Sequence, residues 1–473
     1  MPDFLSVWPK TQRTFVGPEY WANRLQDWQV NQGRVECLVS QENRNLHLLT
    51  WDVNADTGTL SIQVRAGLMN EDQTNRDWNW VGFRLGIQGE FNDFRDNAIY
   101  GKGLDVGVTT RGELFIGDPG EATASSPLDY MGEMDLRIDV KSVRSLFTVT
   151  LSVHDPITGK VWESIQKDSI LNRQLTGNIA LVSHFEDMGA TAETPSVWFA
   201  DWAMSGSKLV HHPERAYGPI MFSHYTLSEK IMKMTAQMAP TGERDAKVVE
   251  LQIKEEEEWK TLGEAAIHKL ARTATFKIQE WDDSKDTPYR LVYKLFTADN
   301  MLTPYYWEGT IRKNPIDQKE LVVAGFTGNN DLGFPNKDLT DNVVLQNPDV
   351  LFFSGDQIYE GVGGYGTQRA PLEKACLDYL RKWYLFGWTY RDLMKDRPSI
   401  SIPDDHDVYH GNIWGEGGKQ ADQSLTGSEA QDTGGYKMDA EWVKMVERTQ
   451  TEHLPDPYDP TKVKQGIGVY YTE

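Results

Sequence analysis

Three carboxylates and two imidazoles crowd into one short stretch near the end of the chain. Ser401-Ile-Pro-Asp-Asp-His-Asp-Val-Tyr-His-Gly411 contains Asp404, Asp405, His406, Asp407 and His410. Like charges at such short range repel one another, so a group of this composition needs a neutralising partner. A divalent or trivalent metal ion is the natural neutraliser, and the stretch therefore predicts a metal site.

Two further polar turns lie upstream and follow the same design. Ser354-Gly-Asp-Gln-Ile-Tyr-Glu360 comes directly after an apolar run at 350–353, as the first stretch follows a run at 400–402. Thr327-Gly-Asn-Asn-Asp331 follows the run at 320–326. Continuous apolar runs of this length are typical of parallel strands buried on both faces.

The segments between these runs predict helices. Residues 339–346 suit a short helix ended by Asn347-Pro348, and residues 371–386 place Leu372, Cys376, Leu380 and Trp383 at helical spacing. Strand, helix, strand, helix, strand predicts a right-handed βαβαβ unit. Ligand sites in such sheets form beyond the carboxyl ends of the strands, so we expect the three turns to converge.

The chemistry of the converging residues suggests their roles. Asp356 is placed to bridge two metals, Tyr359 offers a phenolate, and Asp405 offers an oxygen to the second metal. His406 is either a ligand or an acid that protonates the leaving group. Two metals about 3.5–4 Å apart activate a water and hold phosphoryl oxygens, which predicts metal-dependent hydrolysis of a phosphate ester.

Glycine-rich segments with basic residues follow both acidic turns, at 361–369 and 410–419. Such loops let backbone amides approach an anion, and Arg369 and Lys419 are candidates to bind phosphate oxygens. His410 is either a substrate contact or a structural hydrogen-bonding group. Flexible linkage alone is the alternative interpretation of both loops.

The two acidic turns also carry a family resemblance. Gly355-Asp-Gln-Ile-Tyr359 and Asp404-Asp-His-Asp407 resemble the second and third signatures of calcineurin-like metallophosphoesterases, and the second is similar to the form in PhoD-like alkaline phosphatases. The resemblance covers roughly residues 315–473. It implies two or more metal ions, iron and calcium, with Asp356 bridging, Tyr359 on iron, Asp405 on the second metal and His406 catalytic. It also implies an extracytoplasmic location.

Two departures from that family stand in the sequence. Its first motif, Asp-x-His, is missing, as is the nearby cysteine, which leaves Asn329, Asn330 or Asp331 to supply an oxygen; Asn330 is our candidate ligand. The last run, Gly466-Ile-Gly-Val-Tyr-Tyr-Thr-Glu473, looks like a strand cut at its beginning. We therefore expect a partial metallophosphoesterase domain at 316–473, with several ligands lying beyond the sequence.

The first 208 residues predict an all-β sandwich. Short runs rich in β-branched and aromatic residues recur between turns, and Leu136-Arg-Ile-Asp-Val140 alternates apolar with polar as a strand with one wet face does. The runs at 146–153, 161–165, 177–182 and 197–202 resemble the concanavalin-like lectin and glucanase sandwich. That resemblance implies a glycan- or surface-binding module, and a packing domain without a ligand is the alternative. About seven further short strands at 209–315 suit an immunoglobulin- or fibronectin-like sandwich.

Composition limits the partners. The formal charge of −22 argues against a nucleic-acid-binding surface and against an anionic membrane surface. Cys37 and Cys376 are the only cysteines, so neither a disulfide framework nor a thiolate metal cluster is expected. The start of the chain lacks the charged region and apolar run of a signal peptide, so we expect either a cytoplasmic protein or a targeting segment that this sequence does not include. No apolar window of about 18 residues predicts a membrane span.

Three functions remain open. The leading prediction is a phosphoester hydrolase. Its rival is a glycan- or surface-binding protein with an inactive metallophosphatase remnant, and a metal-binding protein without hydrolytic activity is third.

Overall fold

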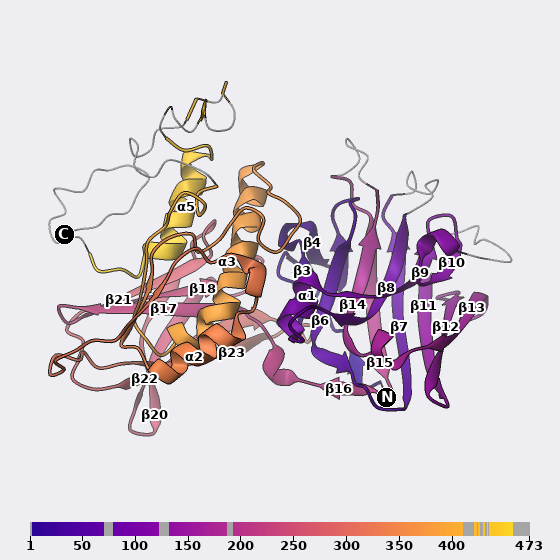
Figure 1. The fold of residues 1–473 in the computed structure, drawn as a ribbon, viewed down its shortest axis with the longest axis horizontal. Coiled ribbons are helices and arrows are strands. Elements are labelled where there is room, and N and C mark those ends of the chain that lie inside the picture. Colours follow the sequence, from indigo (N-terminus) through magenta and orange to yellow (C-terminus); the bar gives the residue numbers. More distant parts are fainter. Residues whose placement is uncertain are drawn as a thin grey trace. The chain divides into compact units, whose positions relative to one another are not determined.

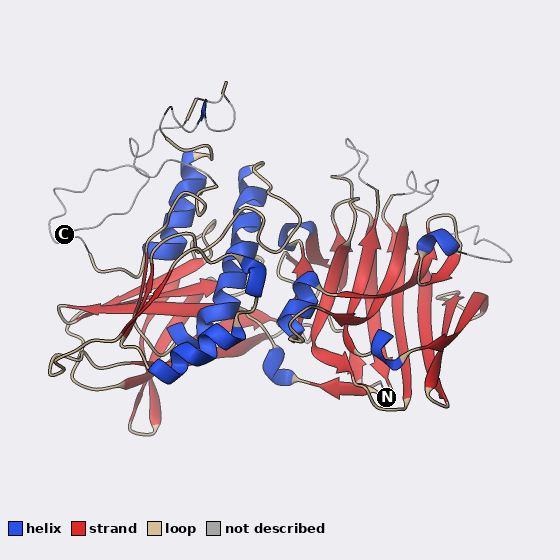
Figure 2. Cartoon of the chain, viewed as in Figure 1, coloured by secondary structure: helices blue, strands red, loops and turns tan. Residues whose placement is uncertain are grey.

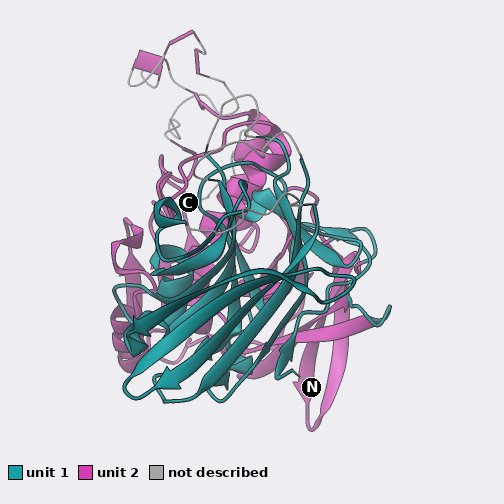
Figure 3. Cartoon of the chain, turned by 90° about the vertical axis from the view of Figure 1, so that its right-hand side faces the viewer, with its two compact units in different colours: residues 1–217, 242–244, 296–301 teal, residues 218–241, 245–295, 302–473 magenta. Residues whose placement is uncertain are grey.

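The computed structural model describes residues 2–70, 79–122, 132–186, 193–409, 421–422, 424–425, 429–430, 433 and 435–456. Its contacts separate two compact units (Figure 3). Unit 1 comprises residues 1–217, 242–244 and 296–301, and unit 2 comprises residues 218–241, 245–295 and 302–473. The finer division into domains at 1–208, 209–315 and 316–473 stays a prediction.

Unit 1 is a β-sandwich of two antiparallel sheets (Figures 1 and 2). One sheet has the order β13 (Val161–Ile170), β12 (Leu146–His154), β11 (Met134–Val143), β7 (Thr59–Leu68), β15 (Val197–Ser205), β5 (Arg34–Cys37), β4 (Trp28–Asn31), β2 (Gln12–Arg13), with β1 (Phe4–Leu5) beside β15. The other has the order β10 (Leu114–Ile116), β9 (Lys102–Thr109), β8 (Trp80–Gln88), β14 (Gly177–His184), β6 (Arg44–Val53), β16 (Leu209–His211), with β3 (Tyr20–Asn23) beside β6.

The alternation in the sequence explains this sandwich. Along β11, Met134, Leu136, Ile138 and Val140 are buried while the residues between them are half-buried or exposed. Apolar side chains from both sheets form one continuous buried cluster, so each strand places its apolar face toward the other sheet. The predicted N-terminal β-sandwich is confirmed. Helix α1 (Phe94–Tyr100) begins at Asp93, whose carboxylate accepts the Arg95 N–H.

Unit 2 contains two antiparallel sheets and one parallel sheet. The first has the order β17 (Ile220–Ser228), β18 (Ile231–Met238), β21 (Thr273–Ile278), and the second β20 (Glu258–Ala266), β19 (Val248–Glu255), β22 (Thr287–Phe296), β23 (Leu302–Ile311). The parallel sheet has the order β24 (Val323–Phe326), β25 (Val350–Phe353), β26 (Ser399–Ser401). Its strands alternate along the chain with helices α2 (Lys337–Gln346) and α3 (Leu372–Met394), as predicted for 316–402. Helix α5 (Ala440–Thr451) follows.

Helix α3 packs against both the parallel sheet and β17. The Phe386 ring lies 5.0 Å from Phe353 of β25, and the Trp383 ring lies 5.6 Å from Phe222 of β17. At Gly387 an added Cβ would lie 2.1 Å from the Phe222 ring, so glycine permits the close approach of helix and strand. This packing makes α3 a rigid support beneath the strand ends.

Two details differ from the sequence predictions. Helix α3 continues to Met394 instead of ending at 386, since no helix-breaking residue precedes Pro398. The prediction that residues 320–326 form a strand buried on both faces is wrong: Leu321, Val322 and Val323 are 59%, 46% and 55% exposed. In the part of the chain that the structure describes, β24 is an edge strand, so its apolar residues are covered less than those of β25. None of the described helices combines the length and apolar character needed to cross a membrane.

Candidate metal centre

The structure brings Asp356, Asp405 and His406 together, with one ligand-type atom of each within 4.8 Å of the others. Asp356 follows β25, and Asp405 and His406 follow β26. These strands are parallel, with Phe353 opposite Ser401, so their carboxyl ends open at the same edge of the sheet. Residues separated by about fifty positions in sequence thereby become neighbours.

The two carboxylate oxygens of Asp356 have different surroundings. Its Oδ2 accepts a hydrogen bond from the Tyr359 hydroxyl at 3.0 Å, whereas its Oδ1 is buried without a hydrogen-bond partner among the described residues. A buried carboxylate oxygen without a partner is costly unless a cation or donor meets it. The two carboxylates and the imidazole of this cluster are ligands that divalent metals accept, so the residues fit a metal ion.

Tyr359 lies against Asp356 as a neutral phenol. Burial, the hydrogen bond to Asp356 and the surrounding negative charges raise the pKa of Tyr359 to about 12. The phenol therefore donates to Asp356 in the metal-free protein. Its predicted role as a ligand stays a prediction.

Glu360 orients His406, a role that the sequence analysis did not assign. The His406 Nδ1 lies 2.8 Å from the Glu360 Oε2. Burial lowers the pKa of His406, but the Glu360 hydrogen bond and the charges of Glu360, Asp356 and Asp405 outweigh it, so the pKa is raised. A carboxylate on one ring nitrogen is the usual way to fix the orientation of a metal-binding histidine.

Asp407 ties the two ligand-bearing loops together instead of facing the metal cluster. Its Oδ1 accepts the N–H groups of Gln357 and Ile358 at 3.1 and 3.2 Å, and its Oδ2 accepts the Asp404 N–H at 2.9 Å. The side chain is fully buried, and burial raises its pKa to about 7. Position 407 therefore has a structural role that its place in an acidic run did not reveal.

Gly355 lets the same two loops approach each other. Its φ of +115° is open to glycine, and an added Cβ would lie 2.6 Å from the Cβ of Asp404. Asp404 in turn accepts the Asp405 N–H at 2.9 Å, and burial raises the pKa of Asp404. Backbone geometry thus fixes the spacing of the loops.

The third turn joins the site through its backbone. The Asn329 N–H donates to the Asp356 carbonyl at 2.8 Å, and the Asn329 Oδ1 accepts from the Tyr390 hydroxyl at 2.6 Å. Asn330, our candidate ligand, is exposed. Asn329 is half-buried and bonded to Tyr390, so it is held more firmly than its exposed neighbour.

Of the three predicted substrate-binding residues, Arg369, His410 and Lys419, the structure describes Arg369. Arg369 contacts Tyr409, whose carbonyl accepts from its Nη1 at 3.5 Å, and the guanidinium carbon lies 5.6 Å from the Tyr409 ring centroid. No contact places Arg369 on the metal cluster, so its substrate role stays a prediction. His410 and Lys419 lie outside the described residues.

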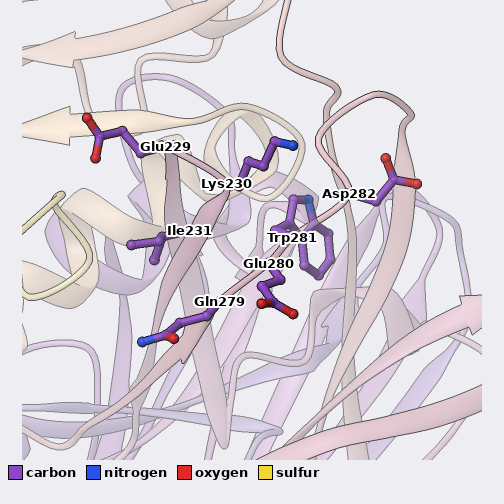
Figure 4. A pocket seen from close by; sticks show the side chains of 7 residues that line it. All are labelled: Glu229, Lys230, Ile231, Gln279, Glu280, Trp281 and Asp282. Carbon is purple, nitrogen blue, oxygen red and sulfur yellow. The ribbon is translucent and has the colours of Figure 1, made fainter.

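A surface pocket of about 670 Å³ lies elsewhere in unit 2 (Figure 4). It is lined by Glu229, Lys230, Ile231, Gln279, Glu280, Trp281 and Asp282 at the β17–β18 turn and after β21. None of the three ligand-type residues lines it. The pocket and the metal cluster are therefore separate features.

Comparisons with known proteins give no family. No family model matches the sequence, and no curated protein matches it. Among solved structures, lectin II from Ulex europaeus is similar at 9% identity and a TM-score of 0.31, covering 44% of this chain and 99% of the lectin. The Emp47p carbohydrate recognition domain is similar at 14% identity and 0.28, covering 42% and 96%. The VIP36 exoplasmic/lumenal domain, in a Ca2+/Man3GlcNAc-bound form, is similar at 10% identity and 0.28, covering 41% and 85%.

The identification as a PhoD-like alkaline phosphatase is wrong. No family model matches, and the similar structures just named are a lectin, a carbohydrate recognition domain and an exoplasmic/lumenal domain. The identification rested on two motifs of only four and five residues, and the family's Asp-x-His motif is missing. Turns that follow buried strands favour Gly, Asp and Asn for backbone reasons, so such short motifs are weakly specific. Iron and calcium were implied by that resemblance alone, and the dinuclear centre stays a prediction.

Proposed function

We propose that unit 2 is a metal-dependent hydrolase whose metal is held by Asp356, Asp405 and His406. The observation that carries the proposal is the convergence of these three residues, together with an Asp356 Oδ1 that is buried and has no partner among the described residues. A metal at this position would supply a Lewis acid and lower the pKa of a bound water. An ester of phosphate is the proposed substrate class, because it offers anionic oxygens to a cationic centre.

The chain's own residues have distinct parts in this proposal. Asp356 and Asp405 provide negative oxygens, and Glu360 holds the His406 ring in place at 2.8 Å. Asp407 keeps the two loops at a fixed separation. With Glu360 on its Nδ1, His406 would offer its other ring nitrogen to the metal as a neutral ligand.

The test is metal binding and hydrolysis by the full chain. We expect calorimetry with Mn2+ to show binding, and p-nitrophenyl phosphate or its bis ester to be hydrolysed when Mn2+ is added. Asp356→Asn and Asp405→Asn should each lower turnover at least a hundredfold, because each removes a negative ligand oxygen. Asp338→Asn, the same change at an exposed position of α2, is the matched control. Turnover unchanged in both ligand variants would refute the hydrolase.

Glycan binding by unit 1 is the second candidate function. The similar structures include the lectin UEA-II in complex with galactose. For this chain the support is its own surface: Phe91, just before α1, and Tyr100, the last residue of α1, are 47% and 37% exposed. Exposed aromatic rings offer flat apolar faces to a ligand. An extracytoplasmic location would accompany this function.

A glycan array with the full chain tests this candidate. We expect binding that Phe91→Ala combined with Tyr100→Ala removes. Tyr306→Ala in unit 2, an exposed aromatic on β23, is the matched control. Absence of binding by the unaltered chain, or binding that the double variant retains, would reject this surface.

A further inference from the structure

A chain of buried hydrogen bonds joins the two ligand-bearing loops to helices α3 and α5. At its centre, the Gln450 Nε2 donates to the Asp407 Oδ1 at 2.9 Å and to the Tyr379 hydroxyl at 3.1 Å. The Gln450 Oε1 accepts from the Gln357 Nε2 at 3.0 Å. Tyr379 also pairs with Thr449 at 2.7 Å.

The members of this chain lie next to the candidate ligands in sequence. Gln357 follows Asp356, and Asp407 follows His406. Gln450 contacts both, so one side chain on α5 bonds both loops that carry the metal cluster. The side chains of Gln357, Asp407 and Gln450 are no more than 2% exposed, so water does not compete for these hydrogen bonds.

We infer that Gln450 is a positioning residue that sets the separation of the two loops and, through it, the affinity for metal. The inference rests on the proposed metal centre. A site built on loops holds its geometry only when rigid elements support it. Helix α5 is such an element, because Asp439 caps its first turn and Trp442, Val443 and Val446 are fully buried.

A second buried contact holds the far end of the 404–409 loop. The Tyr409 hydroxyl donates to Asp378 and accepts from Lys382, both at 2.9 Å, and Asp378 and Lys382 pair at 2.7 Å. Both partners lie on α3. The loop is thus fixed to α3 at Tyr409 and to α5 at Asp407, and Gln450 also hydrogen-bonds to Gln357 of the other loop.

The test is Gln450→Leu in the full chain. Leucine keeps the approximate size, and every group that loses Gln450 retains another partner: Asp407 keeps two backbone N–H groups, Gln357 keeps the Ile402 carbonyl, and Tyr379 keeps Thr449. The variant should therefore fold. We expect its Kd for Mn2+ to rise about tenfold, as for other outer partners of metal ligands. Gln346→Leu, on the exposed surface of α2, is the matched control.

Two further readouts separate positioning from a general loss of stability. We expect the electron paramagnetic resonance spectrum of Mn2+ at saturation to change in Gln450→Leu, because the ligand geometry changes. We also expect faster hydrogen exchange at the Gln357 and Ile358 amides in metal-free protein. In a double-mutant cycle, Asp407→Asn and Gln450→Leu should weaken Mn2+ binding less than additively.

The outcomes distinguish the two proposals. Unchanged Mn2+ affinity, spectrum and amide exchange in Gln450→Leu would overturn the positioning role while leaving the metal centre intact. If the unaltered chain binds no Mn2+, the metal centre itself is wrong, and the claim about affinity falls with it. The amide exchange at residues 357 and 358 then shows whether Gln450 still fixes the loops.

Discussion

Two aspartates, one in each unit, differ in the groups that surround their negative charge. In unit 1, Asp27 is fully buried and accepts from Arg24 at 2.8 Å and Arg44 at 2.6 Å. In unit 2, Asp356 lies beside Asp405 and a histidine, and its buried Oδ1 has no partner among the described residues. The first charge is neutralised from within the fold, whereas the second is gathered with like charges. This difference is what the proposed metal site requires of Asp356.

The same contrast extends to the cations of unit 1. Lys208 is fully buried, and its ammonium donates to the Asn54 and Asp56 carbonyls and to Asn172. Three oxygens thus surround a resident positive charge. At the candidate metal centre two carboxylates and a histidine are gathered instead.

The largest expected effect comes from removing the internally neutralised charge. Asp27→Asn should lower the free energy of unfolding of unit 1 by about 3–5 kcal/mol, because two buried guanidinium groups lose their counterion. Asp356→Asn in metal-free protein should change that of unit 2 by less than about 1 kcal/mol, since relief of repulsion offsets the lost hydrogen bond. Urea unfolding with EDTA measures both. Equal losses of unfolding free energy in the two variants would contradict the difference between Asp27 and Asp356.

Metal addition should stabilise unit 2 alone. Mn2+ at a hundred times its Kd is expected to raise the free energy of unfolding by about 2.7 kcal/mol through mass action. Thermal unfolding with and without Mn2+ measures the shift. Asp405→Asn should abolish it, and Asp27→Asn should retain it. A shift that persists in Asp405→Asn would place the metal elsewhere.

Acid should weaken unit 2 through a buried histidine pair. The rings of His224 and His453 stack 3.8 Å apart and both are fully buried. Burial and the nearby Lys233 lower the pKa of His453 to about 3, and burial and His453 lower the pKa of His224 well below its usual value.

The folded-state pKa values of both histidines lie below the unfolded value of about 6.5. Above that pH both are neutral in the folded and unfolded states, so protonation does not lower the free energy of unfolding. This free energy falls as the pH drops toward 3, by about 1.4 kcal/mol per unit for each histidine. Urea midpoints between pH 7 and 4 measure the slope, and His453→Gln should reduce it. His212→Gln, a partly exposed histidine of unit 1, is the control. An unchanged slope in His453→Gln would assign the acid effect to other groups.

Much of the architecture followed from patterns that are local in sequence. Alternation such as that of residues 136–140 predicts a strand with one buried face, and β11 has that face. Strand and helix periodicities at 339–402 predict the order of β25, β26, α2 and α3, with errors at the ends of helices. Local patterns fail at 321–323, because the exposure of these apolar residues depends on what lies beside the sheet edge.

The sequence by itself determined which residue types lie at the strand ends, and so that Asp356, Asp405 and His406 would be near one another. Only the tertiary structure decided their roles. In the structure Asp407 accepts backbone N–H groups, and Glu360 hydrogen-bonds to His406. Gln450 of α5 donates to Asp407. The physical reason is that a hydrogen bond depends on distance and direction between atoms. Residues far apart in sequence meet those conditions only after the helices and sheets have packed.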